Sequence, residues 1–242
     1  MINCLGRAEI IEKESQKLCL LEICFMKIRC ISELQDSIDD DYTWRFHEIV
    51  CMKTEIQSMN DTNKRLSPMI RSLVMLSYSH WEGFVKHSTR YFLDYLSRLG
   101  LDQSQTHPAL VASSLNYALN NKGRAESTRI IYEILTDKHY KLRYQSEAMC
   151  DPKSNLNFEV LEVISTNIGI DISGLSLKEK QIDEIMLGRR NKMAHGENDS
   201  LDKKYGIEVA DISISMMAEF KTLLQNMIAT ESFKQPNVSY NA

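Results

Sequence analysis

The chain has 242 residues, of which 43% are hydrophobic and 26% charged, with a net charge of −4 and a pI of about 5.9. This length allows one large domain or two small ones with a buried core. The acidic balance argues against a general nucleic-acid coat protein, although it leaves room for a local basic cleft. Only 9 Gly and 4 Pro are present, and this scarcity of turn-forming residues favours long helices.

The six cysteines form no Cys-x-x-Cys pair. His47 and Cys51 lie four residues apart, but no second ligand pair accompanies them, so we expect neither zinc nor any other metal or cofactor. The cysteines are typical of reduced, small apolar residues in a cytoplasmic protein. Since no apolar run approaches the length of a membrane span, no membrane association is expected.

We expect a single helical domain over residues 26–230, with an extension at 1–25 and a flexible tail at 231–242. Met26 is a plausible alternative start of translation. Apolar residues at intervals of three and four predict the first helix of the domain over 31–60.

A long helix is predicted over 68–99, with Ser67 as its N-cap and Pro68 at its first position. Gly83 lowers the stability of this helix by about 1 kcal/mol relative to alanine. A glycine kept at such a position indicates that another group approaches closely there. Two tryptophans are expected in the core, Trp44 and Trp81.

The second half of the chain predicts shorter helices around 110–119 and 127–136. A further helix begins at Ser154 or Asn157 and ends at Gly169. Ser176 and Glu179 form a capping box that opens a helix to His195, where Gly196 ends it, and a last helix covers 207–230. Strand-type alternation is absent, so the sequence predicts an all-α bundle of long central and short accessory helices.

The stretch LGRRNKMAHGEND, residues 187–199, ends the helix opened by the capping box. At about 100° per residue, an apolar stripe forms within about 60° of Ile182, containing Ile185, Met186, Arg189 and Met193. A second cluster lies at about 180–240° and contains Glu184, Gly188, Asn191 and His195. Arg190, at about 80°, is able to turn to either side.

The pattern has two interpretations. Arginine and histidine near a helix C-terminus stabilise the helix dipole and need no further role. Alternatively, His195 lies off the apolar stripe and next to Asn191 because the two are four residues apart, as a catalytic histidine would.

The sequence RNKMAHG resembles the Arg-x4-His signature of the HEPN superfamily, and LSYSHWEGFVK at 76–86 is similar to the first signature helix of a bacterial HEPN group allied to the RiboL-PSP type. Glu82 matches an acidic residue of that group, and TWRFHEI at 43–49 and SNLNFEVLEVISTNIGID at 154–171 resemble its other segments. The resemblance covers about residues 26–230. It implies a helical bundle, a homodimer with the two motifs facing each other, and metal-independent ribonuclease activity.

Under this resemblance, His195 and Arg190 are the first candidates for catalysis, followed by Asn191. RNA can be cut without metal because its 2′-hydroxyl is an internal nucleophile, and histidine can act as base or acid near neutral pH. A guanidinium stabilises the charge that develops on the phosphate. The expected products carry 2′,3′-cyclic phosphate and 5′-hydroxyl ends. Asn191 would position the phosphate or set the histidine tautomer.

Other polar residues are weaker candidates. Arg189 faces the apolar stripe, and Glu82 either orients a site residue or makes a plain surface or capping contact. His80 and His87, seven apart, are expected on one polar face without a ligand role. The basic stretch from 122 to 143 is either a solvated face or an RNA contact, the latter with Lys138, Lys141, Arg143, Tyr140 and Tyr144 as candidates.

Three functions remain open from the sequence. The first is an RNA-cleaving toxin or phage-defence effector, with RNA as substrate and an antitoxin or another defence protein as partner. The second is a non-catalytic HEPN module that binds or assembles as a dimer. The third is a helical scaffold for a partner protein.

Overall fold

The computed structural model describes residues 28–120, 122–152, 155–197 and 200–235. Every regular element in these ranges is a helix, which confirms the predicted all-α class. The expected extension at 1–25, the alternative start Met26, the alternative cap Ser154 and residues 236–242 of the expected tail lie outside the described residues.

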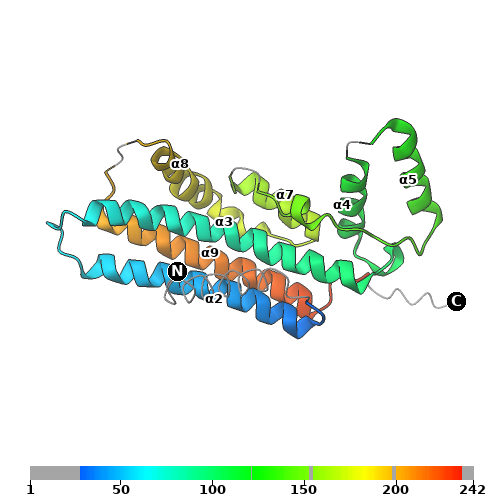
Figure 1. Cartoon of the computed structure of the whole chain (residues 1–242), viewed down its shortest axis with the longest axis horizontal. Coiled ribbons are helices and arrows are strands. Elements are labelled where there is room, and N and C mark those ends of the chain that lie inside the picture. The colour runs from blue at the N-terminus through cyan, green and yellow to red at the C-terminus, as the bar shows by residue number, and fades with distance from the viewer. Residues whose placement is uncertain (1–27, 121, 153–154, 198–199, 236–242) are drawn as a thin grey trace, which may run out of the picture.

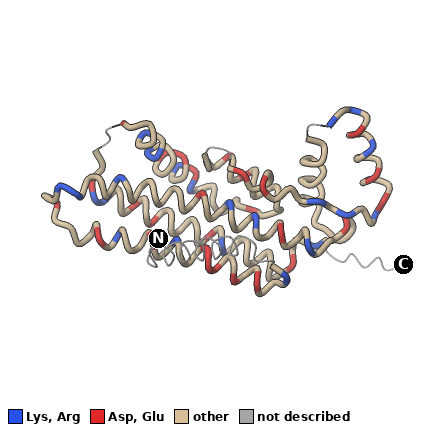
Figure 2. The backbone as a smooth tube through the Cα atoms, viewed as in Figure 1, with Lys and Arg blue, Asp and Glu red and all other residues tan. Residues whose placement is uncertain are grey.

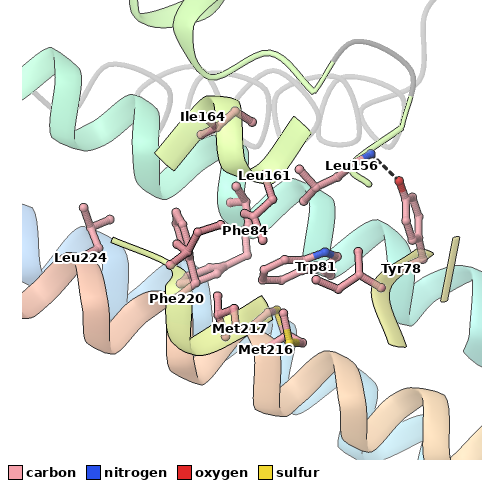
Figure 3. Packing of buried hydrophobic residues seen from close by; sticks show 14 of the residues in the cluster. Tyr78, Trp81, Phe84, Leu156, Leu161, Ile164, Met216, Met217, Phe220 and Leu224 are labelled. Atoms are coloured by element: carbon pink, nitrogen blue, oxygen red, sulfur yellow. Dashed lines mark hydrogen bonds between the residues drawn. The ribbon is translucent and has the colours of Figure 1, made fainter. Parts of the chain in front are cut away.

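Three long helices form the body of the molecule: α2 (Ile31–Ser58), α3 (Leu66–Leu99) and α9 (Lys203–Ala229). They lie side by side, and α2 runs opposite to α3 and α9 (Figure 1). Trp81 and Phe84 from α3 and Phe220 from α9 are fully buried at the centre of the core (Figure 3). The core position predicted for Trp81 is therefore confirmed.

Shorter elements cover one side of this body. At the C-terminal end of α3 lie η1 (Gln103–Gln105), α4 (Pro108–Leu119), α5 (Arg124–Thr136) and α6 (Ser146–Met149), followed by α7 (Phe158–Ile168) along the middle of the bundle (Figure 1). The chain continues through η2 (Ser173–Lys178) into η3 (Gln181–Gly188) and α8 (Arg189–Ala194), which lie along the N-terminal half of α3. The candidate motif is thus placed against α3.

The start of α3 differs from the prediction. The helix begins at Leu66 with Arg65 as its cap residue, so Ser67 is not the N-cap. The turn before it leads directly into the helix, because the Leu66 N–H donates to the Asn63 carbonyl at 3.0 Å. Pro68 is accommodated in the first turn, where backbone N–H groups have no partner within the helix.

The predicted capping box at Ser176 and Glu179 is also wrong. A 3₁₀ helix runs through this segment, and the Ser176 hydroxyl donates to the Ser173 carbonyl at 2.7 Å. Beyond it, η3 is a π-helix, whose hydrogen bonds span five residues, and it passes into the α-helical α8. A uniform 100° wheel therefore does not describe residues 181–188.

The close approach expected at Gly83 is present. A Cβ atom there would lie 2.6 Å from Nη1 of Arg45, so the glycine makes room for the buried guanidinium. The core position predicted for Trp44 is wrong, because Trp44 is 48% exposed. Its ring covers the Arg45 guanidinium at 4.4 Å, and its indole N–H donates to Asp41 at 3.1 Å.

The ends of the later helices follow the sequence more closely. Asn157 caps α7 by accepting from the Val160 N–H at 2.8 Å, and Gly169 ends that helix with a φ of 78°. After α9, Phe233 is fully buried against Phe92 and Tyr95. The packed part of the chain therefore extends beyond residue 230, where the flexible tail was expected to begin.

Candidate active site

The motif occupies α8 and the turn that follows it. Gly196 ends the helix in the left-handed region with a φ of 78°, and the Glu197 N–H donates to the Lys192 carbonyl at 3.0 Å. Arg71 of α3 donates to the Glu197 carbonyl at 3.1 Å. This contact fastens the turn after His195 to the N-terminal part of α3.

Arg190 turns toward α3, which resolves the direction that the sequence left open. Its Nη1 donates to the amide oxygens of Asn155 and Asn191, both at 2.9 Å. Its guanidinium lies over the Tyr78 ring, 4.9 Å from the centroid. The acceptors are neutral amides, and the Arg190 Nε–H is buried without a hydrogen-bond partner among the described residues. These hydrogen-bond partners therefore do not neutralise the half-buried guanidinium, which has donors to spare.

Beneath Arg190, Tyr78 and Glu82 form a polar pair within the apolar core. The Tyr78 hydroxyl donates to Oε2 of Glu82 at 2.7 Å. It also accepts from the Leu156 N–H at 2.7 Å, the bond drawn in Figure 3. Burial and the neighbouring Glu82 carboxylate raise the pKa of Tyr78 well above its usual value. Tyr78 is therefore a neutral hydrogen-bond donor at physiological pH.

The segment 155–158 connects this pair to the motif. Asn155 accepts from Arg190, the Leu156 N–H donates to Tyr78 and also to Glu82 at 3.3 Å, and the Phe158 N–H donates to Asp183 of η3 at 2.8 Å. These contacts hold one short segment against α3, η3 and α8 together. Asn155 and Tyr78 are thus part of the environment of Arg190.

His195 is exposed at the end of α8, in agreement with its predicted place outside the core. No hydrogen bond joins its ring to Arg190 or Asn191, all three of which are described residues. The Asn191 side chain instead accepts from Arg190. The structure thus brings Arg190 and Asn191 into contact and leaves the histidine ring facing outward.

Arg189 lies on a different side of α8 from Arg190. Its guanidinium is 5.5 Å from the centroid of the Tyr205 ring of α9, and the Tyr205 hydroxyl donates to the Ile185 carbonyl at 2.8 Å. The two neighbouring arginines therefore cover two tyrosines of different helices. Arg189 packs toward α9, as its predicted position on the apolar stripe suggested.

The basic stretch proposed for RNA contact lies at the other end of the molecule from α8 (Figures 1 and 2). Lys138 and Arg143 are exposed there, and the Lys141 ammonium donates to the Gly100 carbonyl at 2.6 Å. Tyr140 is half-buried. The Tyr144 ring packs against the core and its hydroxyl is buried, so Tyr144 is poorly placed to stack on a base.

The two histidines of α3 face α2 rather than the motif. Arg45 of α2 contacts Nδ1 of His80 at 3.4 Å and Nδ1 of His87 at 3.1 Å, and Nε2 of His80 lies 2.7 Å from Glu48. His80 is buried, contrary to the exposed polar face expected for it, whereas His87 is exposed. Because guanidinium groups only donate, Nδ1 of His80 acts as an acceptor in this arrangement, whereas Nδ1 of His87 also lies 3.5 Å from Asp41.

The comparison with protein families agrees with this architecture. The family model of HEPN_MAE_28990-like HEPN proteins matches residues 34–233, which is most of the chain. The chain belongs to this HEPN family. The matched region of the HEPN domain begins in α2 and ends at the buried Phe233, and it includes the motif. No curated protein and no solved structure shows a significant match to the chain.

Within the described part of this HEPN chain, no helix is long and apolar enough to cross a membrane. Two residues that contact Arg190 were not predicted from the sequence. They are Tyr78 and Asn155. Tyr78 precedes Glu82 by one helical turn, so the signature helix carried a signal for it. Asn155 is 35 residues from Arg190 and no local pattern connects them.

Proposed function

We propose that this HEPN protein is a metal-independent endoribonuclease. The observation that carries the proposal is the environment of Arg190: a half-buried guanidinium held by neutral partners, on a short helix that an exposed histidine directly follows. An arginine with a purely structural role is usually neutralised, as Arg45 is by two hydrogen bonds to Asp41 at 2.9 and 3.1 Å. Arg190 has its charge available for an anion.

The chemistry follows from these side chains. Arg190 binds the scissile phosphate and stabilises the charge that develops on its oxygens, and Asn191 holds the guanidinium in place. His195 takes the proton from the 2′-hydroxyl or gives one to the departing 5′-oxygen. The reaction leaves 2′,3′-cyclic phosphate and 5′-hydroxyl ends. DNA is not a substrate because it lacks the nucleophile.

A homodimer supplies the second proton-transfer group in this proposal. One motif contains one histidine, whereas the reaction needs both a base and an acid. The exposure of His195 supports a composite site, because its ring is accessible to a second copy. Gly188 supports it too, because the only atom of the described residues within 4 Å of a Cβ there is the Asp183 carbonyl oxygen of the same helix, η3, at 3.3 Å.

The biological setting is proposed from the family. HEPN proteins are often ribonucleases, which supports a toxin or phage-defence effector held in check by a partner protein. Cys30, Cys51 and Cys150 are unpaired, which supports the reducing cytoplasm as its location. The exposed Lys138 and Arg143 would contact an RNA that reaches far beyond the motif.

The test is cleavage of purified total RNA in EDTA by wild type, Arg190→Lys and His195→Ala. Arg190→Lys keeps the charge but loses the planar fork, and we expect a large loss of cleavage from either variant with the fold retained. His47→Ala, which removes an exposed histidine of α2, serves as the control for His195→Ala. Equal cutting by His195→Ala and wild type would show that the site is elsewhere. Absence of cutting by wild type would favour the non-catalytic HEPN module.

A further inference from the structure

Arg190 and the Glu82 carboxylate contact the same tyrosine without forming an ion pair. They contact different parts of Tyr78: the carboxylate accepts from the tyrosine hydroxyl at 2.7 Å, and the guanidinium lies over the tyrosine ring, 4.9 Å from its centroid. The contacts of Arg190 include no ion pair with Glu82. In a half-buried place, where the dielectric constant is below that of water, an arginine and a carboxylate within reach of each other attract strongly.

Glu82 is instead held by two donors. The Tyr78 hydroxyl and the Leu156 N–H both donate to its Oε2, at 2.7 and 3.3 Å. The Tyr78 bond is the shorter, and this hydroxyl remains protonated because burial and the carboxylate raise the pKa of Tyr78. The hydroxyl is positioned in turn by the Leu156 N–H, which donates to it at 2.7 Å.

We propose that Tyr78 is a positioning residue that holds Glu82 away from Arg190 and so keeps the guanidinium available for an RNA phosphate. The role in RNA binding rests on the proposed ribonuclease function. The separation of Glu82 from Arg190 by Tyr78 does not. Without the tyrosine hydroxyl, Glu82 keeps only the longer bond from Leu156 and turns to Arg190. The ion pair that forms competes with the phosphate for the same donors.

Tyr78→Phe isolates the hydroxyl, because phenylalanine keeps the ring beneath the guanidinium. We expect kcat/KM for RNA cleavage to fall by about tenfold or more, as loss of a hydrogen bond to a charged group implies. In a Glu82→Gln background, Tyr78→Phe should lower kcat/KM by less than about threefold, because the competing charge is gone. Equal losses in both backgrounds would overturn the proposal, since a merely structural tyrosine does not depend on the charge of Glu82.

Tyr205→Phe is the matched control. It also removes a hydroxyl from a tyrosine that packs against an arginine of the motif, and that hydroxyl donates to the Ile185 carbonyl. We expect any effect of Tyr205→Phe to be the same with Glu82 and with Glu82→Gln. Dependence of both tyrosines on Glu82 would mean that the coupling is not specific to Tyr78.

A crystal structure of Tyr78→Phe tests the arrangement independently of catalysis. The expected result is a carboxylate oxygen of Glu82 within ion-pair distance of Arg190. A Glu82 side chain that stays away from Arg190 in this variant would overturn the proposal. If wild type cuts no RNA, the proposed function fails, and the crystal structure still decides whether Tyr78 separates the two charges.

Discussion

Gly83→Ala should destabilise the protein, although alanine is the better helix former. In isolation the exchange favours the helix by about 1 kcal/mol. The added Cβ would, however, lie 2.6 Å from Nη1 and 3.1 Å from Cζ of Arg45. Arg45 is buried, and Asp41 fixes its position through two hydrogen bonds, so the guanidinium cannot move without weakening both.

Forced overpacking of this kind costs about 1–3 kcal/mol, and weakening a hydrogen bond between charged groups costs about 1.5–3 kcal/mol more. After subtraction of the helix gain of about 1 kcal/mol, we expect the free energy of unfolding to fall by about 1.5–5 kcal/mol. For a domain of this size the melting temperature should fall by about 3–20 °C, which calorimetry or circular dichroism measures.

Gly123→Ala is the control, because no atom of the described residues lies within 4 Å of a Cβ at that position. A higher melting temperature for Gly83→Ala than for wild type would refute the reasoning. It would mean that Arg45 gives way at little cost and that Gly83 is not required by the packing of α2 against α3.

Three further predictions concern the C-terminal boundary, acid stability and RNA contact. Phe233→Ala should lower the free energy of unfolding by about 3–5 kcal/mol in urea denaturation, because Phe233 is fully buried; an unchanged midpoint would contradict its place in the core. Burial alone would raise the pKa of Asp41, but hydrogen bonds from His87 and Arg45 and the charge of Arg45 outweigh it and lower that pKa. This stabilisation is present above the unfolded pKa of about 3.9 and is lost as the pH falls through the folded value, so wild type should lose stability below about pH 4 more steeply than Asp41→Asn. The double substitution of Lys138 and Arg143 by alanine should weaken binding of an RNA that spans the ~50 Å length of α3 and leave binding of a short oligonucleotide unchanged; equal effects on both would contradict the proposed remote contact.

The fold was predictable because its main elements carry local signals. Apolar spacing indicated the three long helices, and the glycines at 169 and 196 marked the ends of two others. Gly83 indicated a close approach, although the sequence did not identify Arg45 as the group that lies against it. Trp44 was misplaced because its size suggested burial, whereas its ring covers Arg45 from the outside of α2.

The site was only partly predictable. The motif selected Arg190, Asn191 and His195, but the direction of the arginine depends on Tyr78 and Asn155, which contact it from other parts of the chain. The π-helix before α8, which packs against α3 and α9, was missed because the apolar spacing of residues 181–188 fits an ordinary α-helix equally well.

The most direct test of the ribonuclease uses one RNA oligonucleotide and its fully 2′-O-methylated copy, incubated in EDTA with wild type and His195→Ala. The proposed mechanism predicts that wild type cuts only the unmodified RNA, leaves a 2′,3′-cyclic phosphate, and loses this activity in His195→Ala. Cutting of the methylated copy would show that the 2′-hydroxyl is not the nucleophile, and would contradict the mechanism at its first step.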